Sequence, residues 1–314
     1  MASSDDEPSA VAYLAMRVRR RLVWARTAGV GALVEEERLN PLERARVALS
    51  KYRWRRRHGL VRGSGTPVYV VGLQRSGTNM VLRGLDCAPE IEVHNESDRR
   101  VFHRYRLRPD VVVTGTIRRS RHQYVLFKPL CDSHRTADLL ALPGPTPGKA
   151  VWIYRDVDGR ARSSIAKFDD SGLQAVRQII AGDTAIWQAQ GLGPETLRRL
   201  REFPPDALTR ETAAALLWCA RNSLYFELGL DRRPDVFLLS YDRFVSDPDG
   251  VGRELCRFLG LPWRTELFAH VRPRHPVRRP LPIDPAARAM CDEMRARLDC
   301  AAAGPAHVRE EPAL

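Results

Sequence analysis

The chain has 314 residues, of which 44% are hydrophobic, and this length allows one large domain or two small domains with a real core. No uninterrupted apolar run approaches the ~18 residues that a membrane-spanning helix requires. The six cysteines show neither a Cys-x-x-Cys pair nor a metal-ligand rhythm. These features argue against an integral membrane protein, a disulfide-stabilised secreted protein and a cysteine-based metal site, and they predict a soluble, cytoplasmic protein.

The formal net charge of +13 comes almost wholly from arginine, because lysine occurs only at positions 51, 128, 149 and 167. Such a charge favours anionic partners, which include nucleotides, nucleic acids and anionic membrane surfaces. Heavy use of arginine can also reflect the base composition of a genome. The charge alone therefore discriminates poorly among these partners.

The N-terminal part of the chain reads differently from the rest. Residues 1–10 are polar and acidic and predict a disordered tail, and residues 11–65 predict a basic helical extension. A helix around the basic cluster 17–21 is expected to pack on the domain with a solvated basic face, which we favour over contact with a membrane surface. The main domain is predicted over 66–302, with a C-terminal tail over 303–314.

Residues 68–84 predict a strand, a turn and a helix, in which the turn can hold an oxyanion by the free N–H groups at the start of the helix. The spacing of Gly72 and Gly77 matches the loop of nucleoside-triphosphate enzymes, but Thr78 stands where that motif requires lysine. The cation lies instead inside the loop, as Arg75, whose planar fork of donors suits a sulfate or phosphate group. Further polar donors are Ser76, Thr78 and Asn79.

A second stretch of this kind covers residues 151–168, where a hydrophobic strand ends in a charged turn and a helix. Arg155 ends the strand, and Ser163 follows eight residues later on the helix. Both can converge on one anion if the helix folds back over the carboxyl edge of a sheet. Lys167 lies one helical turn beyond Ser163 and can add positive charge on the same face.

The remaining pattern alternates strands with helices. Further strands are predicted over 123–128 and 111–117, and helices over the ranges 173–190, 210–229, 250–259 and 285–300. Strands that each end in a polar turn indicate an α/β fold, with a central parallel β-sheet flanked by helices and an N-terminal helical extension. Ligands are then expected at the carboxyl edge of the sheet.

With these two motifs, the chain resembles the sulfotransferases that use 3′-phosphoadenosine 5′-phosphosulfate (PAPS), over roughly residues 66–280. In that family a loop of the type [KR]-S-G-T-[TS] holds the 5′-phosphosulfate, and an arginine followed eight residues later by serine holds the 3′-phosphate. A late strand contributes a tyrosine near the adenine, and Tyr241 takes that place. The resemblance implies the P-loop-like sulfotransferase fold, PAPS as cosubstrate with no metal required, and a binding set of Arg75, Ser76, Gly77, Thr78, Asn79, Arg155, Ser163, Lys167 and Tyr241.

This sequence departs from the family pattern in three places. Asn79 replaces a hydroxyl residue of the loop, and Gln74 stands where proline is common. The C-terminal phosphate loop of the family has no Arg-Lys-Gly counterpart, although the donor-rich run 270–279 lies at about the right distance along the chain.

Sulfuryl transfer needs a base for the acceptor and positive charge on the sulfuryl oxygens. Glu96 lies where tyrosylprotein and several glycan sulfotransferases carry a catalytic glutamate, so the resemblance implies that Glu96 is the base. His94 is the rival, because an imidazole suits general-base work near neutral pH and cytosolic members use histidine. Lys128 is expected to bind the transferred sulfuryl oxygens, beside Arg75, which neutralises the leaving phosphate.

The expected acceptor is a small molecule, glycan or lipid that presents a hydroxyl or an amine, with no specific nucleic-acid partner and no prediction of oligomeric state. The sequence is also compatible with two other functions. One is a P-loop kinase-like enzyme, which the missing lysine disfavours. The other is a catalytically silent, basic anion-binding protein that keeps the fold.

Overall fold

The computed structural model describes residues 41–144, 146–275 and 279–304, and the chain divides into two units, Met1–Ser50 and Lys51–Leu314. The first unit is described only by residues 41–50, which begin helix α3 (Pro41–His58), a helix with no buried residue. The predictions for 1–40, including the basic cluster 17–21, lie outside the described residues, as do those for 305–314. The predicted domain boundaries stay predictions.

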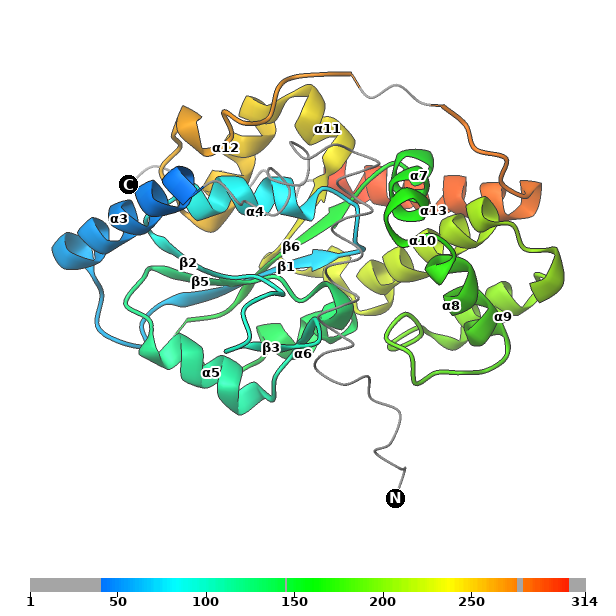
Figure 1. Ribbon diagram of the computed structural model, residues 1–314, viewed down its shortest axis with the longest axis horizontal. Coiled ribbons are helices and arrows are strands. Elements are labelled where there is room, and N and C mark those ends of the chain that lie inside the picture. Colours follow the sequence, from blue (N-terminus) through cyan, green and yellow to red (C-terminus); the bar gives the residue numbers. More distant parts are fainter. Residues whose placement is uncertain (1–40, 145, 276–278, 305–314) are drawn as a thin grey trace. The chain divides into compact units, whose positions relative to one another are not determined.

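The second unit is built on a five-stranded parallel sheet (Figure 1). Its strands lie in the order β2 (Ile91–His94), β5 (Tyr124–Phe127), β1 (Thr66–Gly72), β6 (Lys149–Tyr154) and β7 (Val236–Ser240). All four neighbouring pairs are parallel, so the carboxyl ends of the strands share one edge. The predicted fold class, an α/β fold with a central parallel sheet, is confirmed.

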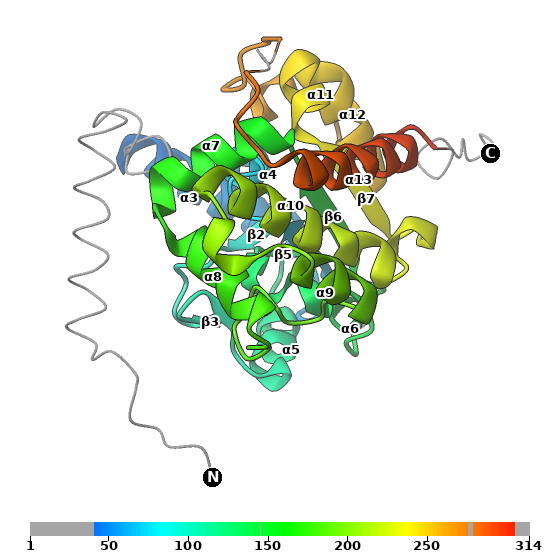
Figure 2. The same ribbon diagram turned by 90° about the vertical axis from the view of Figure 1, so that its right-hand side faces the viewer.

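The side chains of β1 alternate between two hydrophobic clusters, one on each face of the sheet. Val68 and Val70 are in the cluster that also contains residues of α4 (Thr78–Cys87), α11 (Tyr241–Ser246) and α12 (Pro248–Leu259). Tyr69 and Val71 are in the other cluster, with α10 (Arg210–Glu227) and α13 (Pro285–Ala303), which lie against each other (Figure 2). A sheet buried on both faces explains why its strands read as continuous apolar runs.

The remaining elements connect these layers. They are β3 (Phe102–His103) and β4 (Arg106–Leu107), which pair with each other, the helices α5 (Asp110–Arg119), α6 (Thr136–Leu140), α7 (Val157–Phe168), α8 (Ser171–Ile180) and α9 (Pro194–Arg201), and the short 3₁₀ helices η1 (Leu130–Arg135), η2 (Pro205–Ala207), η3 (Leu230–Arg232) and η4 (Thr265–Leu267). Within the described residues, no helix is both long and apolar enough to cross a bilayer.

Two local predictions were wrong. Residues 111–117 form part of helix α5 and not a strand, because Val113 and Ile117, four positions apart, are the buried pair while Val111 stays exposed. The helix predicted over 173–190 ends at Ile180, since Gly182 adopts a left-handed φ of 94° just after it. Tertiary packing overrides the β-propensity of the valine run in the first case.

Candidate functional site

The loop between β1 and α4 depends on two glycines. Gly72 has φ 116°, and a Cβ there would lie 2.4 Å from the carbonyl oxygen of Ile153 on the neighbouring strand. Gly77 caps α4 with φ 93°, and its Cβ would lie 2.2 Å from the ring of Tyr241. Both positions therefore require glycine, and between them Arg75 is held in the left-handed region with φ 70°.

The hydroxyl of Ser76 is the clearest sign that this loop accepts a ligand. Ser76 is fully buried, and its Oγ has no hydrogen-bond partner among the described residues. A buried hydroxyl without a partner is costly in a folded protein. The main-chain N–H groups at the start of α4 add further donors, since no side chain caps this helix. The donor set fits an oxyanion.

The fold brings the two predicted anion motifs together. The Nε atom of Arg75 donates to the hydroxyl of Ser163 over 3.0 Å, and Nη1 of Arg155 lies 3.4 Å from the carbonyl oxygen of Arg75. The guanidinium of Arg155 also stacks on the ring of Tyr241 at 4.5 Å from its centroid. This proximity follows from the sheet, in which Gly72 and Ile153 are direct neighbours on β1 and β6.

Neighbouring elements fix the end of β6. The indole Nε1 of Trp218 on α10 donates to the carbonyl of Arg155 over 2.8 Å. Asp156 caps α7 by accepting from Gly159, and Arg295 of α13 forms an ion pair of 2.6 Å with the same carboxylate. Lys167 lies partly buried one turn beyond Ser163 on the same helix, and its contact with an anion stays a prediction.

Three of the predicted residues meet at the ends of β2 and β5. The ammonium of Lys128 lies 3.0 Å from the carboxylate of Glu96 and donates over 2.6 Å to the side-chain oxygen of Asn79, at the start of α4. Lys128 and Glu96 are both mostly buried, with 8% and 15% of their side chains exposed. Asn79 thus uses its oxygen to orient Lys128, which the sequence analysis did not foresee. In the side chain of Asn79, only the amide nitrogen can act as a donor to a ligand.

His94 lies close by but in a different environment. Its ring is buried, stacks on Phe127 at a centroid distance of 5.3 Å, and bonds through Nδ1 to Asp98 over 2.8 Å. The other ring nitrogen faces Glu92 at 3.5 Å. Although burial alone would raise the pKa of Glu92, interactions with His94 and Ser120 outweigh it and lower that pKa to about 2. His94 is therefore held between two carboxylates and is less accessible than Glu96.

Sequence analysis missed Arg160, which lies behind the loop. Arg160 is almost fully buried on α7, and its Nε donates over 3.2 Å to the carbonyl of Gln74. The available signal was its place in the helix, since it shares the buried face with Val157, Ala161 and Ser164. An arginine on the apolar side of a helix needs a partner inside the protein.

The donor-rich run 270–279 does return to this region in its described part. Nη2 of Arg274 donates to the hydroxyl of Tyr241 over 2.7 Å, and His270 lies 3.0 Å from the carbonyl of Met80 on α4. Residues 276–278 lie outside the described residues. Among the described side chains, no group of three His, Cys, Asp or Glu residues is arranged to bind a metal ion.

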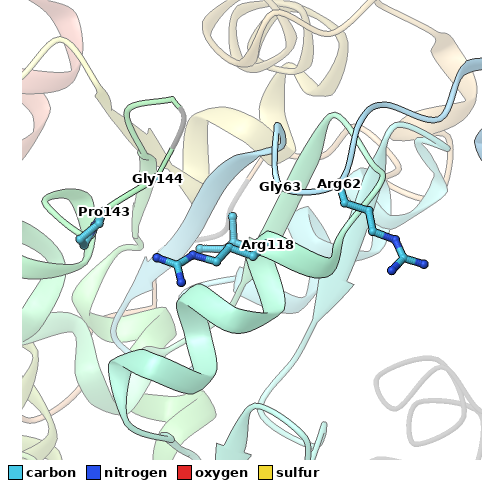
Figure 3. A pocket seen from close by; sticks show the side chains of 6 residues that line it. Arg62, Gly63, Arg118, Pro143 and Gly144 are labelled. Atoms are coloured by element: carbon cyan, nitrogen blue, oxygen red, sulfur yellow. The ribbon is translucent and has the colours of Figure 1, made fainter.

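A surface pocket of about 370 Å³ lies elsewhere, lined by Arg62, Gly63, Ile117, Arg118, Pro143 and Gly144 (Figure 3). Gly63 and Gly144 precede β1 and β6, so this pocket is at the amino ends of the strands. The loops that follow the same two strands are at the opposite edge. The pocket is thus separate from the candidate site.

Comparison with known proteins identifies a family for this chain. The model of the sulfotransferase domain family matches residues 65–272. Among solved structures, the chain is similar to a sulfotransferase from Alicyclobacillus acidocaldarius, with 18% identity, a TM-score of 0.41, and coverage of 76% of this chain and 95% of the other. It is also similar to the sulfotransferase domain of the Synechococcus PCC 7002 olefin synthase, with 14% identity, a TM-score of 0.37, and coverage of 74% and 95%. No curated protein matches. The family model covers most of the chain, and the chain belongs to the sulfotransferase domain family.

Proposed function

We propose that the protein is a PAPS-dependent sulfotransferase that transfers a sulfuryl group to a hydroxyl, or to an amine, of a small molecule, glycan or lipid. The observation that carries this proposal is the contact between Arg75 and Ser163, which joins the two anion motifs into one donor-rich surface. A ligand with anionic groups at both ends of one nucleoside fits such a surface. The family supplies the reaction class, sulfuryl transfer.

The loop residues are assigned to the 5′ end of PAPS. Arg75, the main-chain N–H groups around Gly77, and the hydroxyls of Ser76 and Thr78 bind the phosphosulfate, and Ser76 thereby gains the partner that its buried hydroxyl lacks. Asn79 adds its amide nitrogen. The 3′-phosphate is assigned to Arg155, Ser163 and Lys167, with Tyr241 near the adenine.

The transfer step is an in-line displacement at sulfur. The acceptor oxygen forms a bond to sulfur, while the bond between sulfur and the bridging oxygen of the 5′-phosphate breaks, which releases 3′-phosphoadenosine 5′-phosphate. Glu96 takes the proton of the acceptor hydroxyl, and Arg75 neutralises the charge that develops on the leaving phosphate. No metal is required in this scheme.

Lys128 is assigned to the sulfuryl oxygens. Its ammonium is shared between Glu96 and Asn79, so it is already oriented where the reaction would occur. Preorganised cations of this kind stabilise developing charge without reorganising at the moment of reaction. Glu96 is preferred over His94 as the base because His94 is enclosed by two carboxylates and the ring of Phe127.

A cytoplasmic location is part of the proposal, since the spacing of the cysteines along the sequence lacks the pairing pattern of a disulfide-stabilised protein. The acceptor class stays broad. Contact with a membrane surface and a specific nucleic-acid partner are not part of the proposal.

Two measurements test the proposal in sequence. Calorimetric titration should show binding of 3′-phosphoadenosine 5′-phosphate without added metal, and much weaker binding of ATP with Mg²⁺. Incubation with sulfur-labelled PAPS and a fractionated host extract should then label an acceptor. Tight binding of Mg²⁺-ATP instead would indicate a kinase-like enzyme. Absence of nucleotide affinity, together with steeply salt-dependent binding of polyanions, would indicate a silent anion-binding protein.

A further inference from the structure

Arg160 is a buried cation without a counter-ion. Only 2% of the residue is exposed, and among the described residues no carboxylate lies within ion-pair distance of its guanidinium. Its hydrogen bonds go to two main-chain carbonyls, that of Gln74 over 3.2 Å and that of Ala214 over 3.1 Å. Burial, followed by repulsion from Arg75, lowers the pKa of Arg160 to about 9. A buried charge without a counter-ion is costly.

The bond from Arg160 to Gln74 fixes the direction of a peptide group in the loop. In a trans peptide the C=O and the following N–H point in opposite directions, and the described chain has no cis peptide bond. Since the carbonyl of Gln74 is turned toward Arg160, the N–H of Arg75 is turned away from it. The next carbonyl, that of Arg75, lies 3.4 Å from Nη1 of Arg155.

The bond from Arg160 therefore determines the direction of the N–H of Arg75. This arrangement also supports the left-handed conformation of Arg75, whose φ of 70° is unfavourable for a residue with a side chain. Successive N–H groups beside a left-handed residue form a concave anion site in many proteins. The loop is thus shaped before any ligand arrives.

We propose that Arg160 is a positioning residue for the 5′ anion of the donor nucleotide: it holds the carbonyl of Gln74 so that the N–H of Arg75 faces the ligand, and its charge is balanced only when the anion binds. This inference rests on the proposed function, because it takes the 5′-phosphosulfate as the anion. It predicts that Arg160 matters far more for binding at the 5′ end of the nucleotide than for folding.

Arg221 provides a matched control within the same chain. It is also 2% exposed and also donates to main-chain carbonyls, at 3.2 Å to Trp187 and at 2.8 Å to Gln190. These carbonyls belong to the connection between α8 and α9, and not to the loop that follows β1. Burial lowers the pKa of Arg221 to about 10, and the nearby carboxylates of Asp132 and Glu227 oppose this effect. We therefore expect Arg221 to stabilise the fold at this connection, away from the loop that follows β1.

The experiment compares Arg160→Met and Arg221→Met with the wild type. Arg160→Met should weaken binding of 3′-phosphoadenosine 5′-phosphate by roughly 10-fold or more in calorimetry, the loss expected for one charge-assisted hydrogen bond. Binding of adenosine 3′-phosphate, which lacks the 5′ anion, should not change. In urea unfolding without ligand, Arg221→Met should lose clearly more stability than Arg160→Met, and its folded form should bind both nucleotides as the wild type does.

Wild-type affinity of Arg160→Met for the bisphosphate would overturn the inference, and so would an equal loss for both nucleotides. If Arg160→Met does not fold, Arg160→Leu decides in its place, because it also removes both the donor to the carbonyl of Gln74 and the charge. Wild-type affinity of that variant would equally refute the inference. If the wild type itself binds no 3′-phosphoadenosine 5′-phosphate, the proposed function fails first and the inference falls with it.

Discussion

The molecule contains two regions in which a buried arginine lies beside a partly buried one, and they differ in the carboxylates nearby. At the carboxyl edge of the sheet, neither Arg155 nor Arg160 has a carboxylate within ion-pair distance among the described residues. Near the connection between α8 and α9, Arg106 is paired at 2.5 Å with Asp132, next to Arg221. The second region contains a carboxylate of its own beside the arginines, whereas the first acquires its negative charge from a ligand in the proposed function.

Glu96→Gln, at the carboxyl edge of the sheet, is expected to have the largest effect, which is on turnover. The variant should fold and bind 3′-phosphoadenosine 5′-phosphate, but it should lose roughly 10²–10⁴-fold in turnover because no base receives the acceptor proton. The measurement is transfer of labelled sulfate in the extract fraction that the wild type modifies. Glu195→Gln, on the exposed face of α9, is the control. Near-wild-type turnover would remove Glu96 from the mechanism and leave His94 as the base.

In the second region, Asp132→Asn should affect stability and not binding. Asp132 is 2% exposed, pairs with Arg106 and accepts a hydrogen bond from the N–H of Leu107 over 2.7 Å. Removal of its charge leaves Arg106 and Arg221 uncompensated and should cost about 3 kcal/mol in the free energy of unfolding. Urea denaturation measures this cost. A loss of nucleotide affinity in the folded fraction would break the distinction between the two regions.

Arg155→Ala tests the other end of the nucleotide. It should weaken 3′-phosphoadenosine 5′-phosphate by roughly 10-fold or more, because a charge-assisted contact to the 3′-phosphate is lost. Adenosine 5′-phosphosulfate, which has no 3′-phosphate, should be affected much less. Calorimetry with both ligands gives the comparison, and equal losses would refute the assignment of Arg155 to the 3′-phosphate.

The smallest effect concerns His134, beside Arg221. Burial, then the charges of Arg221 and Arg106, lower the pKa of His134 to about 4. Above its unfolded pKa of ~6.5 the histidine is neutral in both states. As the pH falls from ~6.5 to about 4, the unfolded chain binds the proton first, so native stability decreases.

His134→Gln should remove this part of the pH dependence. Unfolding midpoints at several pH values between 7 and 4 measure it as the difference between variant and wild type, which cancels the titration of carboxylates. The slope cannot exceed the ~1.4 kcal/mol per pH unit that the uptake of one proton contributes, and solvent screening of the partly exposed ring lowers it. Parallel curves for the two proteins would show that His134 titrates normally in the folded state.

The sequence predicted the fold and the anion loops because their signals are local. The run before Gly72 and the run before Arg155 are short, apolar and followed by polar turns, so both strands and their carboxyl ends could be recognised. The valine run of α5 led to the wrong prediction of a strand, because β-propensity carries little weight where only Val113 and Ile117 are buried.

The contacts inside the site could not be predicted in the same way. Lys128 and Asn79 are 49 positions apart, and Arg75 and Ser163 are 88 apart, so only the fold brings them together. Arg160 was missed because a helical arginine is normally assigned to solvent, and its partner is a main-chain carbonyl that leaves no mark on the sequence. The roles assigned to Glu96, Lys128 and the loop residues stay predictions.

The direct pairing of β1 with β6 has a consequence for how the enzyme could change its substrate. Each of these strands leads into one of the two loops that we assign to the nucleotide, and neighbouring strands lie only ~4.8 Å apart, so in the proposed function the sheet fixes the distance between the sites for the two ends of the nucleotide. Segments away from these two strands can vary in length without altering that distance. New acceptors are therefore expected to arise by exchange of outer loops around an unchanged donor site.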